Sequence, residues 1–396
     1  MASQQSQEEV QALQGAIAQA QSASDFNALA DQLLTQQHGI GVAGTRALLT
    51  TFITTLRSRN DHDVWVDVGT HTLELLSASP TASSSFLEQA AQLRELMADG
   101  HEANEDYRAA AQVLAAIPLE SSQRRVPDPD KCLIWIRIVR LYLEDDDATA
   151  AETYLNKLKN VMHAVADPET QLHFRLSAAR INDAKRQFLA ASLAYHDISF
   201  LAAVAEDDRM RTLGEAIKCA ILAPAGPARS RALGRLYKDE RAAGLEQYGI
   251  LEKMFLDRLI DPAEVDKFAQ TLQAHQLATT ADGSTVLARA MVEHNLLAAS
   301  RVYVNIDFDS LGTVLGLDPA KAEDTTAKMI EQGRLRGKID QIDRCIWFAE
   351  DDGDMQGGDA IRQWDKHILG VAEEVENVVA LMQHEIPTFV AQNLVV

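Results

Sequence analysis

The sequence predicts a mainly all-α protein: a right-handed, tetratricopeptide-like helical-repeat solenoid, then a winged-helix subdomain with a small β-hairpin, and then a C-terminal helix. Three observations support this fold class. The chain is 46% hydrophobic but only 6% aromatic, and it is rich in Ala, Leu and Gln, which favours helices over sheets. Alanines recur at 40-residue intervals in the first half. The last helical segment repeats its apolar residues in steps of three and four.

The net charge of −21, from 37 basic and 58 acidic residues, bears on the class of partner. So acidic a surface repels phosphate backbones, and we expect no nucleic-acid partner. Cys132, Cys219 and Cys345 are too far apart for a metal or disulfide motif, so we expect small buried side chains in a reducing compartment. No signal segment or membrane-spanning stretch is recognisable, which predicts a soluble intracellular protein without a membrane partner.

Changes in composition divide the chain into four predicted regions. The first is rich in Gln, Ala and Ser and is predicted to be a polar arm, either mobile or a frayed helix. The predicted boundaries are 1–24 for this arm, 25–200 for the solenoid, 201–358 for a domain made of a helical part (201–283), a winged helix (284–348) and an acidic, glycine-rich loop (349–358), and 359–396 for the C-terminal helix.

The solenoid is predicted from an internal repeat. Ala111, Ala151 and Ala191 are each 40 residues apart, and each precedes larger apolar residues in a helical pattern. Small residues before large ones let two helices approach closely, and a period near 40 is typical of stacked helical hairpins. The alternative is an irregular helical bundle.

Residues 284–348 read as helix, short strand, helix, helix and hairpin. Ser284 or Thr285 can cap the first helix, and 303–306 is β-branched enough for a strand. Asp318 followed by Pro319 is a favourable start for the third helix. Two strand-like runs, 337–340 and 345–348, follow across a polar turn. This order predicts a winged helix.

The segment after the acidic loop is predicted to be a long helix that ends at Pro387. Its apolar positions have a period of 3.5 residues, which is typical of a coiled-coil seam. Either this seam packs on the rest of the chain, or it meets helices of partner subunits in a bundle, which we favour. The predicted bundle residues are Trp364, Ile368, Val371, Val375, Val378 and Met382.

The sequence offers no candidate catalytic, cofactor-binding or metal-binding residues. His384-Glu385 is not followed by a second histidine at helical spacing, so the zinc-protease helix is absent. The run 333–338 has the wrong glycine spacing for a phosphate loop. We therefore expect a protein that is not an enzyme and needs no cofactor.

A winged helix can bind DNA or assemble with other proteins. Lys328, Arg334, Arg336 and Lys338 form a small basic group, but the third helix also carries Glu323, Asp324 and Glu331, which disfavours DNA. The hairpin instead offers a sheet edge that can pair with a neighbouring chain. The predicted subunit interface consists of Gly337, Lys338, Ile339, Asp340, Ile346, Trp347 and Phe348.

A solenoid followed by a winged helix resembles the PCI-domain family, which is shared by the proteasome lid, the COP-nine signalosome and translation initiation factor three. Several stretches resemble more closely the subunit-four family of the signalosome. They are 218–223, 238–241, 248–253 with 257–258, 278–284, 293–297, 339–343 and 364–366. The close resemblance covers roughly 218–366. The chain departs from the family pattern in the acidic loop, which is longer than usual.

The resemblance implies a non-catalytic scaffold and substrate-sensing subunit of the complex that removes the ubiquitin-like modifier Nedd-eight from cullin–RING ubiquitin ligases. Its expected partners are the other PCI and metalloprotease-type subunits, with the cullin–RING ligase as substrate of the complex. The implied location is the cytoplasm and the nucleus. The alternatives are the equivalent proteasome-lid subunit and, from another class, a stand-alone winged-helix nucleic-acid binder.

Overall fold

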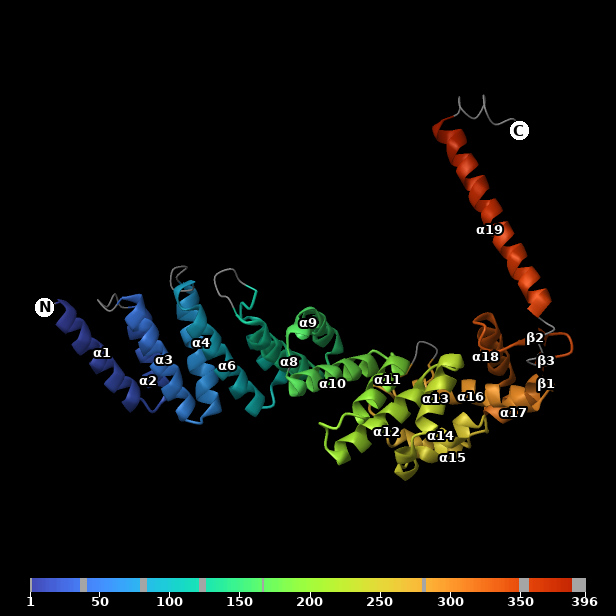
Figure 1. Ribbon diagram of the computed structural model, residues 1–396, viewed down its shortest axis with the longest axis horizontal. Coiled ribbons are helices and arrows are strands. Elements are labelled where there is room, and N and C mark those ends of the chain that lie inside the picture. Colours follow the sequence, from blue (N-terminus) through green and yellow to red (C-terminus); the bar gives the residue numbers. More distant parts are fainter. Residues whose placement is uncertain are drawn as a thin grey trace. The chain divides into compact units, whose positions relative to one another are not determined.

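A computed structural model of the chain describes residues 2–35, 41–78, 84–120, 126–165, 167–279, 283–348 and 356–386. Most of these residues are helical, and short strands occur near the C-terminal end (Figure 1), which confirms the predicted fold class. The chain forms two compact units, Met1–Ala298 and Ala299–Val396. None of the helices in the described ranges combines the length and apolar character needed to cross a membrane.

The regular elements of the first unit are helices that pack mainly on their neighbours in the chain. They are α1 (Ala2–Gln19), α2 (Ala23–Thr35), α3 (Val42–Ser58), α4 (His62–Ala78), α6 (Leu87–Ala103), α7 (Tyr107–Ala115), α8 (Asp128–Glu144), α9 (Ala148–Val161), η1 (Met162–Ala164), α10 (Pro168–Ala184), α11 (Phe188–Ser199), α12 (Glu206–Leu222), α13 (Pro227–Tyr237), η2 (Glu240–Gly244), α14 (Tyr248–Phe255), α15 (Pro262–Ala269) and most of α16 (Val286–Val302).

The N-terminal segment forms helix α1, so of the two predicted alternatives it is a helix, but this helix packs on α2 and α3. Leu13 and Ile17 lie one turn apart on α1 and are buried in a core cluster with Phe26 and Phe52. The rings of these two phenylalanines meet edge to face, with centroids 5.5 Å apart. The polar composition was misleading because a docked helix is stabilised by the few apolar side chains on its inner face.

The 40-residue repeat is confirmed in the middle of the first unit. Ala111, Ala151 and Ala191 lie on α7, α9 and α11 and are each 0% exposed. The turn before each of these helices repeats as well: Glu105, Asp146 and Arg186 have φ values of 60°, 58° and 60°. The N–H of the following residue bonds the carbonyl oxygen five positions earlier, at 2.9, 2.9 and 2.8 Å, as in Schellman helix endings. Each repeat is therefore a helical hairpin with the same turn.

The core does not stop at residue 200, where the solenoid is predicted to end. One hydrophobic cluster contains Phe188 and Tyr195 of α11, Leu213 of α12, Leu251 of α14 and Met291 of α16. Helices α11 and α12 also pack closely on each other. The repeat helices and the following helical part thus share a continuous core.

The second unit begins within α16 and contains a winged helix. Its elements are β1 (Asn305–Asp307), α17 (Phe308–Leu315), α18 (Pro319–Glu331), β2 (Gly337–Asp340), β3 (Cys345–Phe348) and α19 (Gln356–Glu385). The predicted order of helix, strand, helix, helix and hairpin is confirmed, with β1 starting two residues later than expected. Thr285 caps α16 by accepting a hydrogen bond from the N–H of Ala288 at 3.1 Å. Gly316 ends α17 with a φ of 66°, a conformation that favours glycine.

The C-terminal helix α19 begins at Gln356, three residues before the predicted start, so the last part of the expected acidic loop is helical. The rest of that predicted loop, 349–355, lies outside the described residues. Helix α19 ends at Glu385, just before Pro387 as predicted, although Pro387 itself lies outside the described ranges.

Candidate assembly surfaces

The hairpin strands of the winged helix belong to a three-stranded antiparallel sheet with the order β1-β3-β2. Ile346 of β3 lies opposite Ile306 of β1 on one side and Ile339 of β2 on the other. β3 is therefore paired on both sides and offers no edge, so the predicted sheet edge can only be that of β2 within the hairpin. The second side of β3 is taken by β1, a strand that precedes both α17 and α18. Ile346 and Phe348 are buried and cannot present side chains to a partner.

The two faces of this sheet differ in polarity. Ile306 and Ile346 are buried on the inner face, with Ile339 half-buried beside them. The neighbouring row across the sheet consists of Asn305, Trp347 and Lys338, all exposed. Trp347 is 49% exposed, an unusual position for so large an apolar side chain. Of the three predicted interface residues on β3, it is the one that a partner can reach.

β2 supplies the outer edge that the sequence predicts. Within the described ranges it pairs with β3 alone, so its other side is open for strand addition. A Cβ atom on Gly337 would lie 2.7 Å from the carbonyl oxygen of Trp347, so a side chain there would push β2 away from β3. Asp340 closes the hairpin, because its Oδ1 accepts from the N–H groups of Ile342 and Asp343 at 3.0 and 3.1 Å.

The basic group considered for DNA binding lies around α18 and β2, but its charges are partly balanced. Lys328 Nζ is 2.8 Å from the carboxylate of Asp324 on the same helix. Arg334 Nε donates to Gln332 at 2.9 Å. Glu323 accepts from Gln341 at 2.7 Å and remains an acidic group beside the wing. A helix with this mixture of charges is a poor match for a phosphate backbone.

The predicted seam on α19 is exposed along its length. The exposed fractions of Trp364, Ile368, Val371, Val375 and Val378 lie between 55% and 68%, and Met382 is half-buried. Leu369 and Leu381, also exposed, flank the seam. An exposed apolar surface of this extent is typical of interaction sites in proteins. Burial by a partner bundle stays a prediction.

A feature that sequence reasoning missed holds the first part of α16 in the helical core. Three consecutive polar residues, Glu293, His294 and Asn295, bond to backbone groups of two earlier turns. Glu293 Oε2 accepts from Ala225 N–H at 3.3 Å. Asn295 accepts from the N–H of Ile260 at 3.0 Å and donates to its carbonyl oxygen at 3.2 Å.

His294 completes this polar clamp and is 1% exposed. Its Nε2 lies 2.8 Å from the carbonyl oxygen of Arg258, and since a carbonyl only accepts, Nε2 must carry the proton. Burial lowers the pKa of this imidazole to about 4. It is thus a neutral histidine of the core. The sequence signals for the clamp were three consecutive polar residues within a largely apolar helix and their place in the stretch 293–297, and neither of them indicated the backbone groups that these side chains bind.

The cysteines behave largely as predicted. Cys132 and Cys219 are each 0% exposed, and burial raises the pKa of both thiols, which keeps them protonated. Cys345 is half-buried at the start of β3. In the part of the chain that the structure describes, no three His, Cys, Asp or Glu side chains gather so as to hold a metal ion.

Two known protein families match long segments of the chain. The family described as "PSMD12/CSN4, N-terminal" matches residues 2–207. The PCI domain matches residues 252–350, from α14 to just past β3. A Neurospora crassa protein named COP9 signalosome complex subunit 4 is 53% identical over 394 residues, which cover 93% of this chain and 89% of that protein. The chain belongs to the COP9 signalosome subunit 4 family.

Two further members of this family support the assignment. Proteins of the same name from Emericella nidulans and Arabidopsis thaliana are 50% and 44% identical. The matches cover 90% and 74% of this chain and 88% and 74% of those proteins. The predicted resemblance is confirmed, and it extends further upstream than residue 218, where the close resemblance was expected to begin. The solenoid carries a family pattern of its own in addition to its general helical-repeat character.

Proposed function

We propose that this chain is a non-catalytic scaffold and substrate-sensing subunit of the COP9 signalosome. The observation that carries the proposal is the 53% identity, over 93% of the chain, to a protein named as subunit 4 of that complex. The chain is not an enzyme in this proposal. The metalloprotease chemistry that cleaves the modifier belongs to a different subunit, and this chain works in the cytoplasm and the nucleus.

Two surfaces serve assembly in this proposal. The open edge of β2 pairs with a winged-helix sheet of a neighbouring PCI subunit, and the exposed Trp347 packs beside it. The seam of α19 joins a bundle of C-terminal helices from other subunits. The β2 edge exposes unpaired backbone groups and the α19 seam exposes a long apolar stripe. Such groups are usually covered by other parts of the same protein or by a partner.

The substrate is reached through a third region. The helical-repeat solenoid helps to receive the neddylated cullin–RING ligase, and the winged-helix region relays that binding to the catalytic subunits. The family resemblance supports this division of labour. Helical-repeat solenoids are suited to it, because their stacked hairpins create extended binding surfaces.

Native co-purification tests the proposal. The chain is tagged at its N-terminus, which leaves α19 free, and is isolated from extract of its own organism at native expression level. We expect PCI and metalloprotease-type signalosome subunits in near-equimolar amounts. Elution of the chain alone at 43.5 kDa, with proteasome-lid subunits, or with nucleic acid would contradict it.

A further inference from the structure

Helix α13 carries a stripe of positive charge in a chain whose net charge is −21. Arg231, Arg235 and Lys238 are exposed, and their spacing of four and three residues places them on one face of the helix. Helix α13 and its C-cap residue Lys238 together include no Asp or Glu. We call these three residues the α13 basic stripe.

Carboxylates of the chain do not balance this stripe. Arg231 donates to the carbonyl oxygen of Pro227 at 3.3 Å, and the other two cations make no hydrogen bond or ion pair with the residues that the structure describes. The next carboxylate in the sequence, Asp239, is bound by the guanidinium of Arg241, at 3.0 and 2.6 Å. Glu240 follows it and is exposed. The cations of the stripe are thus available to an anionic partner.

The helix dipole explains part of the stripe. Arg235 lies in the last turn of α13 and Lys238 at its C-cap, where a positive charge is favourable. Arg231 lies in the middle of the helix, beyond the reach of this effect. The dipole therefore accounts for the end of the stripe but not for its length.

A stack of three aromatic rings lies beside the stripe. The ring of Tyr237 on α13 stacks on those of Tyr248 and Phe255 of α14, with centroid distances of 5.9 and 4.6 Å. All three side chains are half-buried. Phe255 also lies against Gly234, where an added Cβ would be 3.1 Å from its ring. Gly234 is one helical turn from both the first and the last cation of the stripe, so the rings adjoin it.

The turn after α14 adds exposed apolar groups. Leu256, next to Phe255, is 40% exposed, and Leu259 is 47% exposed. We call the α13 basic stripe, the three stacked rings and Leu256 the α13–α14 surface. Arginine and aromatic residues are enriched at protein–protein interfaces, and both occur together here.

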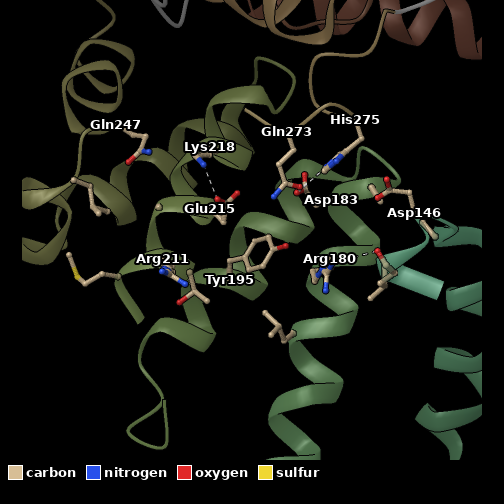
Figure 2. Close-up of a pocket in the computed structure, with 18 of the residues that line it drawn as sticks. Asp146, Arg180, Asp183, Tyr195, Arg211, Glu215, Lys218, Gln247, Gln273 and His275 are labelled. Atoms are coloured by element: carbon tan, nitrogen blue, oxygen red, sulfur yellow. Dashed lines mark hydrogen bonds and ion pairs between the residues drawn. The ribbon is translucent and has the colours of Figure 1, made fainter. Parts of the chain in front are cut away.

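A cavity of about 940 Å³ in the same unit provides a contrast (Figure 2). Each of the basic side chains among its lining residues has a carboxylate partner. The four pairs are Arg180–Glu144, Lys218–Glu215, His275–Asp183 and Arg211–Asp208, at 2.9, 2.8, 3.2 and 3.9 Å. Unlike the α13 basic stripe, the lining of this cavity therefore offers balanced charges.

We propose that the α13–α14 surface binds an acidic segment of a partner protein. Carboxylates of that segment pair with the α13 basic stripe, as in other acidic motifs that are recognised by clustered arginines, and an aromatic or apolar side chain of the segment packs on the ring stack or on Leu256. From Arg231 to Lys238 the helix rises by about 10 Å, which about three residues of an extended chain span. Alternate acidic residues in an extended segment therefore match the stripe. This inference does not rest on membership of the signalosome.

Nucleic acid is the other polyanion that a basic stripe can bind. Affinity for nucleic acid grows with the number of phosphates that are neutralised, and three cations in a chain of net charge −21 neutralise few. A nucleic-acid chain also extends past the stripe over an acidic surface, whereas a short acidic segment contacts the stripe alone. The charges therefore favour an acidic peptide.

Peptide pools provide the probe. Nine-residue pools carry Glu, Gln or Lys at positions 3, 5 and 7 and randomised residues elsewhere, and each is passed at physiological salt over the immobilised full-length chain. We expect the Glu pool to be retained about five- to tenfold more than the Gln pool, which is the factor expected from three exposed ion pairs. Peptides recovered from the Glu pool should be enriched in aromatic and apolar residues at the randomised positions. A single-stranded oligothymidylate is the nucleic-acid probe.

A stripe variant locates the binding. It combines Arg231→Gln, Arg235→Gln and Lys238→Gln, which remove the three charges and keep polar side chains of similar length. Because all three positions are exposed, the variant should keep the circular dichroism and the melting temperature of the parent chain. We expect it to retain the Glu pool no better than the Gln pool.

The control variant has the same change in net charge. It combines Arg108→Gln, Arg140→Gln and Arg175→Gln, at exposed positions on α7, α8 and α10, and should retain the Glu pool as the parent chain does. Three outcomes would overturn the proposal. They are equal retention of the Glu and Gln pools by the parent chain, an equal loss of Glu-pool retention in the two variants, and stronger retention of the oligothymidylate than of the Glu pool.

Discussion

The imidazole of His294 donates a hydrogen bond from Nε2 to the carbonyl oxygen of Arg258 at 2.8 Å, and so ties α16 to the turn that follows α14. The neighbours Glu293 and Asn295 accept hydrogen bonds from the backbone N–H groups of Ala225 and Ile260. These bonds satisfy backbone groups in two turns that have no regular structure of their own. The stretch 293–297, one of those that resemble the subunit-four family, therefore has a structural role in this fold.

We predict that this histidine makes folding sensitive to acid. Its pKa is 6.5 in an unfolded chain and about 4 in the fold, so between these values the unfolded state binds more protons. The contribution of His294 to the free energy of unfolding is therefore fully present above pH 6.5. It falls as the pH drops, by on the order of 2 kcal/mol between pH 7.5 and 5. Urea unfolding at several pH values measures this.

The matched variant is His294→Gln, which keeps a donor but cannot titrate. The other titratable groups remain in the variant, so its free energy of unfolding should still fall at low pH. The fall should be smaller than in the parent chain over the same pH range. Parallel curves for the two proteins would show that His294 does not cause the pH dependence.

Local signals explain which parts of the winged helix could be predicted. Asp318-Pro319 starts α18 and Gly316 ends α17, and both are short-range rules that hold in the structure. The position of β3 in the middle of the sheet was not predictable in that way, because it depends on pairing with a strand from before two helices. The clamp around His294 likewise depends on backbone groups in distant turns, and α1 depends on two buried side chains.

The repeat alanines give a prediction for the solenoid. Ala151 is 0% exposed on α9, so Ala151→Leu would force a larger side chain between packed helices. We expect a loss of about 1–3 kcal/mol in unfolding free energy, measured by urea denaturation. Thr149→Leu, at an exposed position on the same helix, should change stability by less than about 0.5 kcal/mol. Equal losses would mean that the alanine is not selected for close packing.

A proline scan of β2 tests the sheet edge. In an antiparallel edge strand, successive N–H groups point alternately toward the partner strand and away from it. Of Lys338→Pro and Ile339→Pro, one therefore removes a bond to β3 and the other removes an outward donor. Hydrogen exchange at Ile346 and Trp347 identifies the variant with an intact sheet. We expect that variant to lose neighbouring PCI subunits in pull-downs, and full retention of them would refute the edge-pairing proposal.

A charge in the middle of the α19 seam should weaken incorporation into the complex. Each seam side chain contributes about 1.5–3 kcal/mol when fully buried, so Val375→Asp should reduce co-purification strongly. Glu374→Ala changes a residue off the seam and should have little effect. Because Val375 is 56% exposed, both variants should melt within about 2 °C of the parent chain. Unfolding of the Val375→Asp chain would instead show that the seam packs against the rest of the same chain.

Cleavage of a neddylated cullin tests most directly the claim that this chain is a non-catalytic subunit of a deneddylating complex. Three samples are compared: the purified chain alone, the signalosome assembled without it, and the same assembly after the chain is added back. We predict no cleavage and no stoichiometric zinc for the chain alone, weak cleavage without it, and restored cleavage after addition. Cleavage by the isolated chain, or full activity of the complex that lacks it, would contradict the account.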